Sequence, residues 1–258
     1  MLERHCKYGY SNAMDAKLKQ ETEKYFKKEF ADVLLKKLKD GHALSAFNVN
    51  PFLVTALSQG VLGEATPLNI AKSLLYPRVF GTSISTILGD KLQKFCIHLG
   101  ARASGMQGMD IEFEEKSSGK QFILQLKAGS DTLNSGDVEP IVEKMNMAYR
   151  LLKRNWSAEM PIFGMGVLYG SYEDLSGHYR KIASSPVGGQ PNATMLVGKD
   201  FWHSLTGDEN FYADLISIFA ELFEKEDNSS LFKKDLEILS GEIEARYFTD
   251  GKFDPKKF

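Results

Sequence analysis

Hydrophobic residues recur at helical spacing along residues 15–39, with lysines and glutamates between them. They are Leu18, Tyr25, Phe26, Phe30, Val33, Leu34 and Leu38. This spacing predicts a long amphipathic helix, which Gly41 is placed to end. The lysines could face DNA, although a solvated helix face is the simpler interpretation.

The helical pattern continues through residues 50–100 but is interrupted at two prolines, Pro67 and Pro77. Proline ends or begins helices because it lacks an N–H and fixes its backbone angle. The segment therefore predicts two or three helices, the last over residues 83–99.

The pattern changes after Gly100. The sequence MDIEFE at 109–114 alternates apolar and acidic residues, and QFILQLK at 121–127 is an apolar run with polar residues on one face. The turn-rich tetrapeptide KSSG lies between them at 116–119. Two strands at this separation predict a β-hairpin.

Helical and extended patterns alternate in the rest of the chain. We expect a helix over 137–153, a strand over 162–169, a Gly/Pro/Ser-rich loop over 184–194, and a short strand and helix within 195–205. Two amphipathic helices finish the chain. The predicted fold class is α/β, with a small mixed central sheet flanked by helices.

Composition narrows the class of protein without fixing its function. Hydrophobic residues make up 43% of the 258 residues and charged residues 26%, as in ordinary globular proteins. No apolar run reaches the roughly 18 residues that suggest a membrane span. The net charge of −2 argues against a protein that coats nucleic acid non-specifically, but a specific DNA enzyme depends on the local field of its cleft.

The N-terminus and the cysteines bear on where the protein acts. The first residues lack the apolar segment of a secretory signal. Ser11-Asn12-Ala13-Met14 resembles the remnant of an expression tag, so residues 1–14 are expected to be a tag remnant or disordered. Cys6 and Cys96 form neither a metal-ligand pattern nor a disulfide framework, and they fit a reducing cytoplasm.

The second strand of the hairpin carries the candidate chemistry. Side chains alternate along a strand, so Gln125 and Lys127 share the face opposite the leucines. A lysine on an apolar strand needs a partner, and Asp110 is the nearest candidate. A carboxylate that binds a divalent cation, beside a lysine, suits phosphodiester hydrolysis. A plain cross-strand ion pair is the simpler alternative. Gly129 would let the backbone at Ser130 approach a phosphate.

The hairpin resembles the core of the PD-(D/E)XK nucleases. Further short motifs, in the same order, resemble a subgroup of type II restriction endonucleases that cut interrupted palindromes with a GGNCC core. They are NPF at 50–52, PRVFG at 77–81, LKAG at 126–129, GVLYG at 166–170, HYR at 178–180 and VGKDFW at 197–202. The resemblance covers residues 50–205.

The resemblance implies roles for the hairpin residues. Asp110 would be the metal-binding acid, Lys127 the motif lysine, and the main-chain carbonyl of Leu126 a second ligand for Mg²⁺. Gln125 stands where the superfamily usually has Glu or Asp, so its neutral amide would coordinate a metal more weakly. A further carboxylate could compensate, and the candidates are Glu64, Asp90 and Glu112.

Residues that read DNA are harder to identify from the sequence. Arginine binds guanine with two hydrogen bonds, and lysines and hydroxyls contact phosphates. The candidates lie outside the obvious helix faces, and they are Arg78, Arg102, Ser130, Arg180 and Lys181. For each of the basic residues, a surface or structural charge is the simpler interpretation. The loop at 184–194 could be a recognition loop or a plain connection. The histidines show no metal spacing, and Trp156 and Trp202 are expected in the core.

The resemblance, taken with these patterns, implies a homodimeric, Mg²⁺-dependent type II restriction endonuclease that cuts double-stranded DNA in the cytoplasm. We expect a single endonuclease domain over residues 15–258, with a catalytic core at about 83–205 and helical additions before and after it. Two alternatives stay open. A structure-specific repair or recombination nuclease would share the fold, and a catalytically silent DNA-binding protein would explain Gln125.

Overall fold

The chain forms two compact units. The computed structural model describes residues 14–33, 36, 43–79, 84–154, 159–224 and 228–257. The sheet unit, as we name it, comprises residues 1–22 and 92–218, and the helical unit comprises residues 23–91 and 219–258. The expectation of one endonuclease domain over 15–258 stays a prediction, because compact units can act together as one functional domain.

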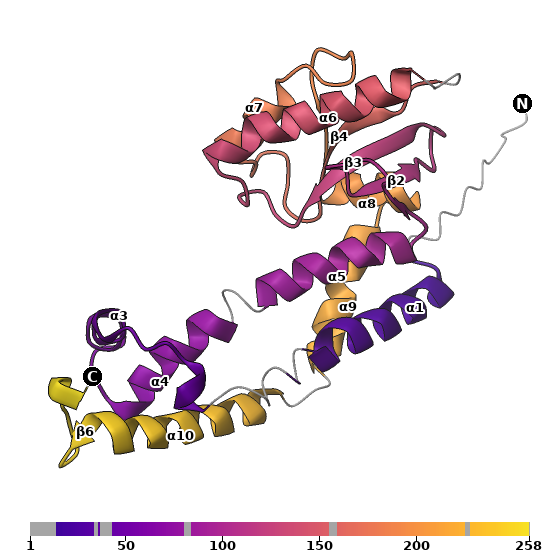
Figure 1. The fold of residues 1–258 in the computed structure, drawn as a ribbon. Helices are drawn as coiled ribbons and strands as arrows, with labels where there is room; N and C mark the ends of the chain where they lie inside the picture. The colour runs from indigo at the N-terminus through magenta and orange to yellow at the C-terminus, as the bar shows by residue number, and fades with distance from the viewer. Residues whose placement is uncertain are drawn as a thin grey trace, which may run out of the picture. The chain divides into compact units, whose positions relative to one another are not determined.

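A mixed five-stranded sheet lies at the centre of the sheet unit (Figure 1). Its strands follow the order of the sequence: β1 (Arg102–Ala103), β2 (Ile111–Glu114), β3 (Gln121–Lys127), β4 (Ile162–Val167) and β5 (Thr194–Val197). The pairs β1–β2 and β2–β3 are antiparallel, whereas β3–β4 and β4–β5 are parallel. The predicted hairpin is therefore confirmed, and the mixed α/β class with it.

Helices cover both faces of this sheet (Figure 1). On one face, α6 (Val138–Lys153) and α7 (Gly177–Ala183) share a hydrophobic cluster with Ile123 and with the buried residues of β4. On the other face, α8 (Lys199–Thr206) brings Phe201 against β4. A Cβ at Gly166 would lie 2.7 Å from the Phe201 ring, so glycine is what allows α8 to approach this closely.

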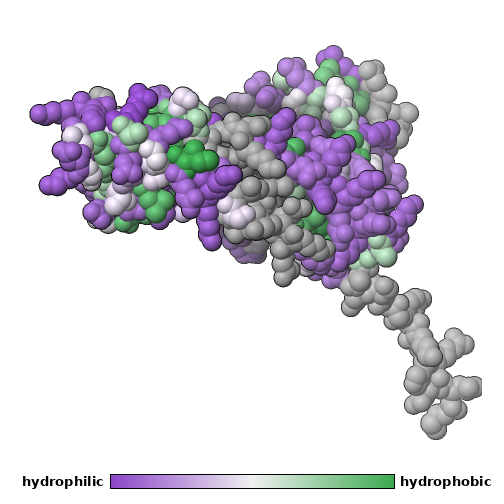
Figure 2. Space-filling view, turned by 90° about the horizontal axis from the view of Figure 1, so that it is seen from below, coloured by the Kyte–Doolittle hydropathy of each residue, from purple (hydrophilic) through white to green (hydrophobic). Residues whose placement is uncertain are grey.

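The helical unit has a separate core. Helix α10 (Asn228–Tyr247) packs against α4 (Pro67–Tyr76), and their buried residues form one cluster with Val54 of α3 (Pro51–Thr55). The chain continues from α3 as a π-helix over Ala56–Val61, and a small hairpin of β6 (Phe248–Thr249) and β7 (Lys252–Phe253) follows α10. Phe52 is 86% exposed, but the surface in Figure 2 is mostly hydrophilic, with small hydrophobic patches.

The helix predictions are largely confirmed where the structure describes the chain. The N-terminal helix appears as α1 (Ala16–Phe26) followed by a π-helix over Lys27–Ala31, while its expected end at Gly41 lies outside the described residues. The prolines fall at boundaries as expected: Pro67 begins α4, and Pro77 follows its last residue. Helices α5 (Ile84–His98) and α9 (Phe211–Glu224) were also expected.

One prediction was wrong. Arg180 and Lys181 do not lie outside the helices but on α7, a seven-residue helix that begins at a glycine. Only Tyr179 and Ile182 of this helix are buried, which is too few for a periodic pattern.

Two expectations about the whole chain concern cysteines and membranes. Cys96 is buried, its thiol donates to the Leu92 carbonyl, and burial raises the pKa of the thiol. Cys6, Trp156 and the tag-like segment before Met14 lie outside the described residues. Among the described helices, none is long and apolar enough to cross a membrane.

Candidate active site

Asp110 is held by three hydrogen bonds, two of them to β3 and one to Ser104, the residue after β1. Its main-chain N–H donates to the Leu124 carbonyl over 2.9 Å, and its carbonyl accepts from the N–H of Ser104 over 3.0 Å. Its side-chain Oδ2 accepts from the main-chain N–H of Leu126 over 2.6 Å. The half-buried carboxylate is therefore fixed at the point where the chain enters β2.

Gln125 and Lys127 lie on the sheet face that α6 covers. In the register with β4, Gln125 is opposite Met165 and Lys127 is opposite Val167, and both partners belong to the cluster under α6. Gln125 Oε1 is buried and has no hydrogen-bond partner among the described residues. A buried amide oxygen without a donor is costly, so this atom is available to a ligand.

Asp110 does not form an ion pair with Lys127, which was the simpler alternative for this pair of residues. The ion pairs among the described residues involve neither Asp110 nor Lys127. The carboxylate instead bonds to the backbone between Gln125 and Lys127. The Lys127 ammonium is consequently not neutralised by a carboxylate in the described part of the chain.

Hydroxyl groups stiffen the loop that follows β3. Tyr179 Oη donates to the Gly129 carbonyl over 2.8 Å, and Thr132 Oγ1 lies 2.7 Å from the same hydroxyl. Burial raises the pKa of Tyr179 to about 12, so the phenol stays protonated and able to donate. These contacts hold the backbone immediately after Lys127.

The loop that follows β4 is fixed from three directions. Trp202 Nε1 donates to the Leu168 carbonyl over 2.8 Å, and the N–H of Gly170 donates to Tyr212 Oη over 3.3 Å. A Cβ at Gly198 would lie 2.0 Å from the Gly170 carbonyl oxygen, and Gly198 has a positive φ of 49°. The ends of β3 and β4 are thus a rigid edge of the sheet.

The expected compensating carboxylates do not gather around Asp110 within the sheet unit. Glu112 accepts a hydrogen bond from Ser104 Oγ over 2.7 Å. Glu64 and Asp90 belong to the helical unit. Among the described residues, no three His, Cys, Asp or Glu side chains form a group suited to a metal ion. Of the three candidate carboxylates, only Glu112 therefore belongs to the same unit as Asp110.

Among the basic residues proposed to read DNA, Arg180 has a structural role. Its Nε donates to the Leu175 carbonyl over 3.0 Å and its Nη2 to the Glu173 carbonyl over 2.8 Å, which closes the loop after β4. Lys181 is exposed on α7, and Ser130 is half-buried beside Gly170.

The other two candidate arginines, Arg102 and Arg78, belong to different units. Arg102 is exposed on β1 of the sheet unit. Arg78 belongs to the helical unit, where its Nη1 donates to the Ala46 carbonyl over 2.6 Å and its guanidinium lies 4.7 Å from the centre of the Phe47 ring. Three of the four predicted basic residues therefore belong to the sheet unit, and Arg78 alone belongs to the helical unit.

The loop at 184–194 is tied to α6. Asn146 donates to the Pro186 carbonyl over 3.0 Å and accepts from the N–H of Gly188 over 3.2 Å. Val187 and Gln190 pair across the turn. The segment is an ordered connection on the α6 side of the sheet.

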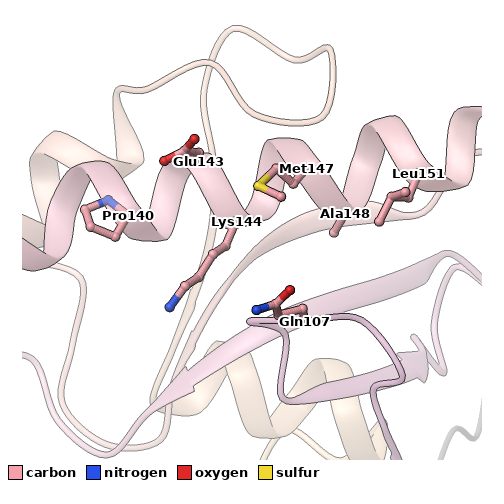
Figure 3. Close-up of a pocket in the computed structure, with 7 residues that line it drawn as sticks. All are labelled: Gln107, Pro140, Glu143, Lys144, Met147, Ala148 and Leu151. Atoms are coloured by element: carbon pink, nitrogen blue, oxygen red, sulfur yellow. The ribbon is translucent and has the colours of Figure 1, made fainter.

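Lys144 and Tyr169 were not singled out in the sequence, although they lie against Gly108 and Gly129, just before and just after the hairpin. Lys144 extends from α6 (Figure 3). A Cβ at Gly108 would lie 2.6 Å from its Cδ. The same stretch of α6 borders a hollow of about 240 Å³ on the side of Gln107. The glycine two residues before Asp110 was the only hint of such a close approach.

The sequence matches the family model described as Type II restriction endonuclease EcoO109I over residues 13–228. A comparison with curated proteins found no significant match. Because the family match spans most of the chain, the protein belongs to the type II restriction endonuclease EcoO109I family, and it is a sequence-specific DNA endonuclease of a restriction–modification system.

Proposed function

We propose that this endonuclease hydrolyses DNA at a PD-(D/E)XK centre formed by Asp110, Gln125 and Lys127, with Mg²⁺ as its cofactor. One observation carries the proposal: the Asp110 carboxylate is bonded to the backbone of Leu126, between Gln125 and Lys127. This bond places the Asp110 carboxylate beside two groups that lack partners among the described residues. They are the buried amide oxygen of Gln125, which has no hydrogen-bond donor, and the ammonium of Lys127, which has no carboxylate.

The oxygen atoms present fit a hard divalent cation. Mg²⁺ prefers carboxylate and carbonyl oxygens and keeps several waters. Asp110 would supply the charge, and Gln125 Oε1 would supply a neutral ligand that has no other partner. The N–H and C=O of one residue in a strand point to the same side, and the Leu126 N–H points to Asp110. Its carbonyl is therefore expected to act as the third protein ligand.

Lys127 would act on the phosphate itself. Its side chain leaves β3 two residues beyond Gln125, so it lies next to the proposed metal ligands on the same face. An ammonium there stabilises the negative charge that develops on the phosphate oxygens and orients the attacking water. When bound, the cation lowers the pKa of its water and neutralises phosphate charge.

The substrate and assembly follow from the same proposal. The sequence resemblance favours an interrupted palindrome with a GGNCC core in double-stranded DNA. A palindrome has two-fold symmetry, and a two-fold homodimer places one centre on each strand. We expect the enzyme to act in the cytoplasm, where a partner methyltransferase would protect the host's own DNA.

The proposal is tested by cleavage of a fully sequenced, unmethylated phage DNA with Mg²⁺ or with EDTA. We compare the wild type with Lys127→Ala and with Lys120→Ala, which removes an exposed lysine just before β3. Discrete Mg²⁺-dependent fragments are expected from the wild type and from Lys120→Ala. Lys127→Ala should lose at least about 100-fold in rate.

Each other result would reject a stated part of the proposal. Equal cleavage by Lys127→Ala would remove Lys127 from the centre, and cleavage in EDTA would remove the metal. A smear without discrete fragments would favour a nuclease that reads DNA structure. Intact DNA with a clear gel shift would favour the silent DNA-binding protein that Gln125 also suggests.

A further inference from the structure

Tyr169 lies at the end of β4, directly beside the residues that follow Lys127. The pairing of β3 with β4 continues past the strands, because the N–H of Leu168 donates to the Lys127 carbonyl over 3.0 Å and the N–H of Tyr169 donates to the Ala128 carbonyl over 3.1 Å. The position of Tyr169 is therefore fixed relative to Lys127 by main-chain hydrogen bonds.

The ring of Tyr169 lies over Gly129. A Cβ at Gly129 would be 2.4 Å from both Cζ and Oη of Tyr169, which no real side chain could tolerate. The hydroxyl end of the ring is thus placed above a backbone position two residues after Lys127. The Cα atoms of two residues this close in sequence are at most about 7 Å apart.

The Tyr169 hydroxyl has no protein partner in the described part of the chain, and the side chain is 44% exposed. The neighbouring Tyr179 differs, because its hydroxyl is engaged with the Gly129 carbonyl and with Thr132. A phenol on a partly exposed residue, with no protein partner for its hydroxyl among the described residues, is a preformed donor for an anionic acceptor.

We propose that the Tyr169 hydroxyl donates a hydrogen bond to a DNA phosphate next to the scissile one. This inference rests on the proposed function, in which Lys127 contacts the scissile phosphate. Successive phosphates of a DNA strand are separated by a distance comparable to that from Lys127 to Gly129. Tyrosine is one of the side chains that contact phosphates and so set the register of a protein on DNA.

Tyr169 would act as a positioning residue. A hydrogen bond to a charged group contributes more than one between neutral groups, and the contact would exist in the ground state and in the transition state. Removing the hydroxyl should therefore weaken DNA binding about tenfold and change the single-turnover rate of bound DNA much less.

The experiment uses Tyr169→Phe, with Tyr172→Phe as the matched control. Tyr172 lies three residues later and is 50% exposed, so the control removes a hydroxyl from the same loop. Binding is measured by gel shift with Ca²⁺ in place of Mg²⁺. The DNA is a duplex containing the cleaved site, with either neighbour of the scissile phosphate replaced by an uncharged methylphosphonate.

At one of these two positions, the methylphosphonate should weaken wild-type binding about as much as Tyr169→Phe does, and it should add little in the variant. Tyr172→Phe should respond like the wild type. Additive losses, or an unchanged Kd for Tyr169→Phe, would overturn the inference while leaving the Lys127 result intact.

The same comparison remains possible if the wild type cleaves nothing, which would end the proposed function. Gel shifts are then made with fragmented phage DNA. Weaker binding by Tyr169→Phe alone would still support a phosphate contact, and equal binding by all three proteins would reject it.

Discussion

The carboxylate of Asp110 and the main-chain N–H of Leu126 are joined by a 2.6 Å hydrogen bond across the hairpin. Leu126 stands between Gln125 and Lys127, so this one bond sets the carboxylate relative to both side chains. The same contact also satisfies a backbone donor of β3. Asp110 therefore has a structural role in the hairpin that is separable from any role in metal binding.

Substitution of Asp110 should separate these two roles. Asp110→Asn keeps an oxygen that can accept from Leu126 but loses the charge, whereas Asp110→Ala loses both. We expect both variants to lose DNA cleavage, and only Asp110→Ala to lose about 1–3 kcal/mol of unfolding free energy because a donor is left unpaired. Cleavage assays and urea unfolding measure the two effects, and equal destabilisation would contradict the separation.

Gln125→Glu should strengthen metal binding. In the proposed PD-(D/E)XK centre the substitution would supply the negative ligand that Gln125 lacks, so half-maximal cleavage should need less Mg²⁺. Two close carboxylates should also lower Tm without metal, and Mg²⁺ should restore it. Gln59→Glu, the same change at an exposed residue of the helical unit, is the control. A response shared by both variants would mean that Gln125 is not a ligand.

Tyr179 should contribute to stability in a pH-dependent way. Its folded pKa is raised to about 12, above the ordinary value near 10. A raised pKa means that the stabilising effect is fully present below about pH 10 and is lost as pH rises toward 12. Between pH 10 and pH 12, the unfolding free energy of the wild type should fall faster than that of Tyr179→Phe. Parallel curves would show that the phenol titrates normally.

Gly129→Ala should push the Tyr169 ring from its place. The new Cβ would overlap the ring, and overpacking of this kind typically costs about 1–3 kcal/mol. Adding Tyr169→Ala removes the overlapping atoms, so the double variant should be more stable than additivity predicts. Thermal unfolding of the two single variants and the double variant measures this coupling. Strict additivity would contradict the contact.

The sequence predicted those features that depend on residues close together along the chain. The hairpin at Asp110 was predictable because alternation of side chains along β3 depends only on neighbouring residues. The helix α6 was predictable for the same reason, since its buried residues recur every three or four positions. The paired strands then follow from the short turn between β2 and β3.

Other features depend on contacts between distant residues and could not be predicted. The burial of Gln125 requires α6 to dock on the sheet, and the Tyr169–Gly129 contact requires β4 to pair with β3. The strand β1 is two exposed residues long, so it has no pattern to read. Alternation correctly placed Lys127 on the same face of the sheet as Gln125, but it could not show that the Asp110 carboxylate bonds to the backbone.

The division of the chain into two units affects the order in which its parts can fold during translation. The five strands of the sheet lie in one continuous stretch of the sequence. Helix α4, in contrast, packs against α10, which is translated much later. During translation, the nuclease sheet can therefore close while the apolar side of α4, including Ile70 and Leu75, still lacks its cover. In ribosome-bound chains that end before residue 228, the amides of the hairpin should already be protected from hydrogen exchange. The apolar residues of α4 should still be exposed in these chains and prone to aggregation.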